Sequence, residues 1–239
     1  VPDAAERASR RERYEALLGI LAELAEQRAS FLAGEPRDAS AALYYHTRRL
    51  EMERIAAGDF DYPVAKMDQM VGFYAAWARN RRAPPAVVEP HWRDYFSVQA
   101  TPGEALSPVQ LARMLRAGIE AHVQHDLERS IRHVLRGPSV RGANPAVLFD
   151  EFASTNSLFE ESSLLGLADL EAHLPDSWGM AFANSGAMQW LLGGAARKAL
   201  LIDLPGERTA LRRRIAGDGE EAGTLTTNTP RLRHEPVDF

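Results

Sequence analysis

A histidine and a carboxylate stand one helical turn apart in a stretch patterned as a core helix. His122 and Asp126 are separated by four residues within the apolar-periodic run 108–135, which starts directly after Ser107. Residues at positions i and i+4 share one face of a helix. Because both side chains are costly to bury alone, the spacing predicts a site where they pair with each other, a metal or a ligand.

Three interpretations of this pair are open. In the first, Asp126 orients His122 and raises its basicity for acid/base catalysis. In the second, the pair is half of a metal site, since histidine and aspartate at this spacing can bind one ion. In the third, the pair is a structural hydrogen bond between helices. Arg129 and His133 fall in the same arc, with His125 at its edge, and this arc is expected to border the aliphatic core.

The candidate site residues follow from the first interpretation, with aromatic side chains lining an apolar pocket and polar ones orienting a substrate. The predicted catalytic residues are His122, Asp126, His125 and Asn156. The predicted substrate-binding residues are His46, Glu53, Tyr45, Tyr74, Glu120, Arg129 and Trp190.

A complete metal site needs more ligands than one helix supplies. Other predicted helices carry His46, Glu53 and Asp68, and Asp150 and Asn156 lie near the next break; these side chains could converge in a bundle core. However, the chain has no cysteine, and the Glu-x-x-His pattern of di-iron bundles is absent. We therefore expect no bound metal and no cofactor, and a metal-dependent hydrolase with His/Asp ligands is the alternative hypothesis.

Apolar periodicity predicts an all-α protein, a single-domain bundle of about seven helices with an extended C-terminal tail. Residues 1–205 are expected to form the helical domain, and residues 206–239 a basic helix and the tail. Trp92, Tyr95 and Phe96 are expected to hold the proline-rich loop 80–104 against the core. The expected helices are 3–32, 38–57, one starting at 61–63, 108–135, one or two within 146–172, 177–202 and 207–216.

Composition narrows the classes of partner. The formal net charge of −5 over 239 residues gives no reason to expect nucleic acid. No apolar run reaches the roughly 18 residues of a transmembrane helix, and no signal peptide is visible, so a cytoplasmic location without a membrane partner is expected. The expected partner is a small-molecule substrate, with a homodimer as one possible assembly.

The segment 118–127 resembles the signature of a bacterial helical family of unknown function, DUF5995, which reads Gly-Met-Asn-Ala-His-Ile-Asn-x-Asp-Leu. Gly58-Asp59-Phe60-Asp61 is similar to a second conserved stretch of that family. Glu120 and Gln124 replace two family asparagines, which indicates a different ligand. The resemblance implies that Ala121, His122, Asp126 and Asn156 matter, without implying a reaction. The leading hypothesis is a small-molecule enzyme of bacterial specialised metabolism, and a non-catalytic binding protein is a further alternative.

Overall fold

The structure is a computed structural model that describes residues 4–34, 38–98 and 107–144, together with 146–148, 150, 151, 158, 161, 162, 165, 166 and 169. Most of these residues are helical and none of them forms a strand, so the all-α prediction is confirmed. No described helix combines the length and hydropathy required to cross a membrane. The α-helices are α1 (Ala4–Leu32), α2 (Ala39–Ala56), α3 (Pro63–Arg82), α4 (Arg93–Ser97), α5 (Pro108–Ala121) and α6 (Leu127–Arg136).

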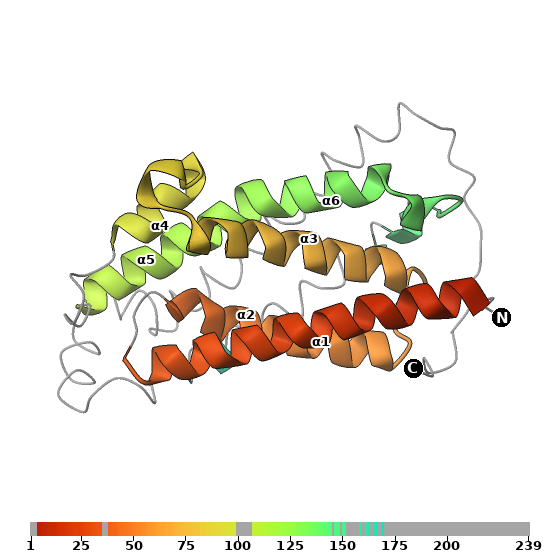
Figure 1. Cartoon of the computed structure of the whole chain (residues 1–239), viewed down its shortest axis with the longest axis horizontal. Coiled ribbons are helices and arrows are strands. Elements are labelled where there is room, and N and C mark those ends of the chain that lie inside the picture. The colour runs from red at the N-terminus through yellow and green to blue at the C-terminus, as the bar shows by residue number, and fades with distance from the viewer. Residues whose placement is uncertain are drawn as a thin grey trace.

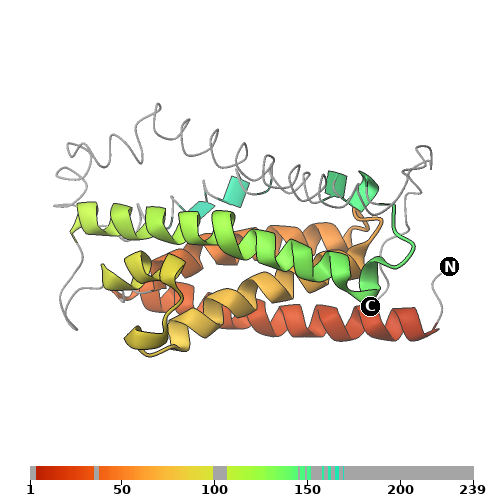
Figure 2. The same ribbon diagram turned by 90° about the horizontal axis from the view of Figure 1, so that it is seen from above.

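The long helices pack lengthwise against one another. Helix α1 lies along α2 and α3, and α3 lies along α6 (Figure 1). Helix α5 packs on α2 and on the short α4. Seen from above, α5 and α6 form one continuous rod over the other helices (Figure 2). The aromatic side chains of Trp77, Trp92 and Tyr95 are completely buried in the core between these elements.

Within the described residues, the predicted ends of the helices 3–32, 38–57 and 108–135 agree with the observed ones to within one residue, but the connection after α3 differs. It was expected to be a loop, and the structure instead places 3-10 turns at Pro85–Val87 and Pro90–Trp92, followed by α4. Proline fixes the backbone angle φ near the helical value and needs no hydrogen bond at the first helical position, so it starts these turns as well as ending α3. Trp92 and Tyr95 are both fully buried, as expected of residues that hold this segment to the core.

The predicted helix 108–135 also needs a correction. It runs from Pro108 to Arg136, but residues His122–Asp126 form a π-helical turn, closed by a hydrogen bond from the backbone N–H of Leu127 to the carbonyl of His122. A π turn contains one extra residue, which rotates every later side chain by about 100° around the axis. Such turns are frequent at functional sites.

This rotation overturns part of the predicted polar arc. Arg129 and His133 were expected to border the core beside His122, and both are exposed. Leu127, Ile131 and Val134 face the core, as expected of the aliphatic positions of this helix, and they pack in one cluster against α3.

Gly118 allows α5 to approach its neighbours closely. A Cβ atom added there would lie 2.8 Å from Oγ of Ser40 and 2.9 Å from Cδ2 of Tyr95. Both distances are shorter than carbon contacts allow. Any side chain at position 118 would therefore push α5 away from α2 and α4, one turn before His122.

A buried ionic network joins α2 to α3. The ammonium of Lys66 donates to Oε1 of Glu51 at 2.6 Å and to Oε1 of Gln69 at 3.0 Å. The guanidinium of Arg48 donates to the other oxygen of Glu51. Each of these charged side chains is at least 97% buried.

Glu151 covers the start of α3, where its carboxylate accepts from the backbone N–H groups of Asp61 and Tyr62. Burial raises the pKa of Glu151 to about 7, although these two backbone hydrogen bonds act in the opposite direction. The predicted helix 177–202, the segment 206–239 and the domain boundary at 205 lie outside the described residues.

Candidate functional site

The carboxylate of Asp126 is the centre of the candidate site, and its side chain is fully buried. Its Oδ2 accepts a hydrogen bond from Nε1 of Trp92 at 3.0 Å, and its Oδ1 lies 3.1 Å from Nε2 of His91. Nδ1 of His122 is 3.1 Å from Oδ2. Three nitrogen-bearing rings therefore surround one carboxylate, two of them from the connection between α3 and α4.

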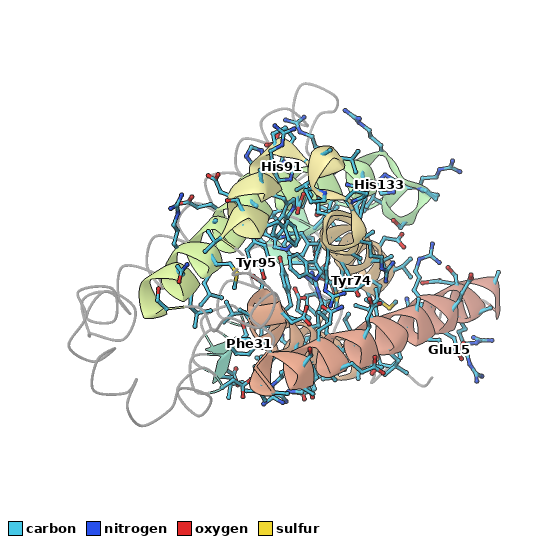
Figure 3. The ribbon with its side chains drawn as sticks, turned by 60° about the vertical axis from the view of Figure 1, so that its left-hand side comes forward. Glu15, Phe31, Tyr74, His91, Tyr95 and His133 are labelled. Carbon is cyan, nitrogen blue, oxygen red and sulfur yellow. The ribbon has the colours of Figure 1, made fainter. Side chains whose placement is uncertain are left out.

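That connection is held in place by the end of α3. The buried side chain of Asn80 accepts from the backbone N–H of Glu89 at 2.9 Å and donates to the carbonyl of Ala76 at 2.9 Å. Glu89 directly precedes the turn that carries His91 and Trp92. Asn80 thus fixes where these rings meet Asp126. Figure 3 shows His91 among the short helices beyond α3, whereas Tyr95 lies inside the bundle.

His122 sits in an aromatic cage. Its ring centroid is 4.3 Å from that of Tyr44, 4.5 Å from Phe73 and 4.4 Å from Trp92, and the Tyr44 and Trp92 contacts are edge-to-face. Trp77 lies farther out, at 6.1 Å. Only 4% of His122 is exposed. These rings leave the imidazole few orientations, so its nitrogens are fixed in direction.

The two nitrogens of His122 have different surroundings. Nδ1 is within ion-pair distance of Asp126, but the oxygen lies off the direction of the ring N–H, so the contact is electrostatic and not a directed hydrogen bond. Nε2 is buried without a hydrogen-bond partner among the described residues. With the proton on Nδ1 beside the carboxylate, Nε2 is an unshared lone pair in an apolar enclosure.

Burial and charge set the protonation of this pair. Burial lowers the pKa of His122 and outweighs the opposing contact with Asp126. Burial raises the pKa of Asp126, but its contacts with His122 and His91 outweigh burial and hold that pKa below its ordinary value. The pair therefore consists of a neutral imidazole and an ionised carboxylate near neutral pH.

Two further predicted site residues lie beside this centre. The ring of His125 is exposed and lies next to that of His91, with centroids 4.6 Å apart and ring planes tilted by 34°. Arg129 is half exposed, and its guanidinium lies 3.0 and 3.1 Å from the two oxygens of Glu89. Both belong to the outer rim of the site and not to the enclosure around His122.

The structure places the other predicted residues elsewhere. Nε2 of His46 lies 2.7 Å from Oδ2 of Asp169, a carboxylate that also accepts two hydrogen bonds from Arg28, and Arg28 in turn lies over the ring of Tyr45. Tyr74 is buried between α3 and α1 (Figure 3). The remaining described candidates, Glu53 and Glu120, are exposed.

Two of the metal ligands expected from the sequence also lie away from this centre. Asp68 accepts a hydrogen bond from Arg13 at 2.5 Å, and Asp150 is exposed. The predicted residues Asn156 and Trp190 lie outside the described residues. The structure therefore brings His122, Asp126, His125 and Arg129 together, and it does not add His46 or Glu53 to them.

Sequence reasoning missed Glu89, His91 and the cage residue Phe73. Glu89-Pro90-His91-Trp92 places three side chains capable of polar contacts in four residues of a proline-punctuated segment. Polar and aromatic residues concentrated in such a connection are a signal of function. Trp92 was assigned only to the core, although its indole N–H also holds Asp126.

Comparison of the chain with family models, curated proteins and solved structures gave no match. The resemblance to DUF5995 is therefore a prediction that these comparisons leave untested.

Proposed function

We propose that the protein is a small-molecule enzyme in which His122 is the general base and Asp126 orients it. The single observation that carries the proposal is the buried Nε2 of His122, which has no hydrogen-bond partner in the part of the chain that the structure describes. An unsatisfied polar atom in a protein interior costs about 1–3 kcal/mol. A substrate that donates a proton to Nε2 would recover this cost, and the lone pair is available for that transfer.

The surroundings of His122 support this assignment. General bases in unrelated enzymes have a carboxylate at one imidazole nitrogen and leave the other for the substrate. Asp126 lies 3.1 Å from Nδ1 of His122, and a small rotation of either side chain would turn this contact into the hydrogen bond that those enzymes use. Trp92 fixes Asp126, so the orienting group is itself held in place. The aromatic walls favour an apolar or aromatic organic substrate over a highly charged one.

The remaining expectations form part of the same proposal. The substrate class is that of bacterial specialised metabolism, the location is cytoplasmic, and a homodimer is one possible assembly.

The test uses the full chain and an extract of bacterial metabolites, followed by mass spectrometry over time. The expected result is consumption of at least one compound by the wild type and a loss of about 10²–10⁴-fold in rate for His122→Phe. Phenylalanine keeps the aromatic packing and removes both nitrogens. His133→Ala, on the exposed side of α6, is the matched control and should keep the wild-type rate.

Stability separates catalysis from a structural role. His122→Phe removes the unpaired Nε2 but also the contact of Nδ1 with Asp126, so the free energy of unfolding should fall by no more than about 1–3 kcal/mol and the variant should stay folded, while turnover is lost. Consumption at the wild-type rate by a folded His122→Phe protein would contradict the proposal. Binding of a compound without its conversion would assign the chain to non-catalytic binding proteins instead.

A further inference from the structure

A second cluster of polar atoms surrounds Oδ1 of Asp126, the oxygen that does not face His122. Nε2 of His91 is 3.1 Å from Oδ1 of Asp126 and 3.3 Å from Oε2 of Glu89. Ligand-type atoms of Glu89, His91 and Asp126 all lie within 4.8 Å of one another. The imidazole nitrogen is therefore placed between two carboxylate oxygens, one from each side.

The carboxylate of Asp126 offers a buried oxygen to this arrangement. Its side chain has no exposed surface, and within the described part of the chain its contacts come from two imidazoles and an indole. None of these groups carries a permanent positive charge, and no arginine or lysine contacts this carboxylate there. A cation bound between Asp126 and Glu89 would add an ionic partner to the polar contacts that these rings supply.

We infer that Glu89, His91 and Asp126 bind one divalent transition-metal ion of the zinc type. Zinc is bound by histidine nitrogen and carboxylate oxygen at about 2.0–2.2 Å, which places neighbouring ligand atoms of a tetrahedron about 3.3–3.5 Å apart. The two separations that involve His91 are already close to these values. Small side-chain shifts suffice to close the site.

Three protein ligands leave a coordination position open, which is the arrangement of catalytic and not of structural zinc. Glu89 and His91 lie on the partly exposed side, so this position is reachable from the rim where the ring of His125 contacts that of His91. Asp126 would bind the ion through Oδ1 while Oδ2 keeps its contacts with Trp92 and His122. The site thus shares one carboxylate with the proposed general base.

The sequence has no complete ligand pattern and no cysteine, and the further ligands that it suggested, such as His46 and Glu53, lie on helices. The proposed set comes instead from a connection and a π turn. Asn80 serves as a positioning residue, since its side chain holds the backbone and the carboxylate of Glu89 without contacting the ion.

Glu89 is shared with two arginines, which weakens the site. Arg79 and Arg129 donate to its Oε1, and Arg129 also reaches Oε2. A permanent positive charge next to a cation site lowers its affinity. Removing the charge of the exposed Arg129 should therefore strengthen metal binding, whereas a purely structural role for Glu89 predicts no such gain.

The experiment is titration of the chelator-treated full chain with Zn²⁺ by calorimetry, with Co²⁺ absorption as a report on coordination. We expect one ion per chain at this site, a loss of at least about tenfold in affinity for His91→Ala and for Glu89→Gln, and tighter binding for Arg129→Gln. His133→Ala is the control and should bind as the wild type. Circular dichroism checks that each variant is folded.

Two outcomes would overturn the inference. One is the absence of binding by the folded wild-type chain. The other is binding that His91→Ala and Glu89→Gln leave unchanged, which is an adventitious ion only. Neither outcome bears on catalysis by His122. That proposal is tested by the turnover of His122→Phe in the metabolite extract, and this variant keeps the three proposed metal ligands.

Discussion

The close approach of α5 to its neighbours makes a quantitative prediction at Gly118. Alanine there gains about 1 kcal/mol of helix propensity over glycine. Its Cβ, however, would lie 2.8 Å from Oγ of Ser40 and 2.9 Å from the ring of Tyr95, which is completely buried. Overpacking of this kind costs about 1–3 kcal/mol.

Gly19 provides the matched control. It lies in the interior of α1, and a Cβ added there meets nothing within 4 Å. Gly19→Ala gains the same propensity without a clash, so the difference between the two variants isolates the packing cost, and we expect about 1–3 kcal/mol in the free energy of unfolding. Gly72→Ala, with an ordinary contact of 3.8 Å, should behave like Gly19→Ala.

Urea unfolding followed by circular dichroism measures these differences. Because 1 kcal/mol corresponds to about 2–4 °C in a protein of this size, thermal unfolding provides a second measurement. Equal stabilisation by Gly118→Ala and Gly19→Ala would refute the tight α5 packing that positions His122. If the packing is as described, Gly118→Ala should also reduce turnover, because α5 moves one turn before the catalytic histidine.

Three further predictions concern buried charge. The pKa of Glu151 is raised in the folded protein to about 7 from 4.5, so its stabilising contribution is present below about pH 4.5 and is lost as pH rises through 7. In urea unfolding at several pH values, Glu151→Gln should reduce the change in the free energy of unfolding over this window by about 1–3 kcal/mol. The same pH dependence in the variant and the wild type would contradict the raised pKa. Trp92→Phe deprives Asp126 of an N–H donor and should lower the free energy of unfolding by about 1.5–3 kcal/mol, as measured by chemical denaturation. A change near zero would show that this hydrogen bond contributes nothing to stability. Lys66→Met leaves the buried charge of Glu51 without its ammonium and should cost about 3–5 kcal/mol by the same measurement, whereas a neutral result would show that Glu51 is not ionised.

The short-range patterns of the sequence were sufficient for the helical fold. Ser107-Pro108 and Gly137-Pro138 correctly marked the two ends of the rod formed by α5 and α6, because caps and prolines act through the local backbone. The same periodicity placed His122 and Asp126 on one buried face, since their four-residue spacing is a property of the helix itself.

The rest of the site was decided by tertiary structure. The π turn at 122–126 has no recognised residue pattern, yet its extra residue turned Arg129 and His133 out to solvent. His91 reaches Asp126 across 35 residues of sequence because Asn80 and the packing of α3 on α6 fix the intervening connection. Periodicity records which face of a helix is buried, whereas the identity of the group it meets depends on how the helices pack.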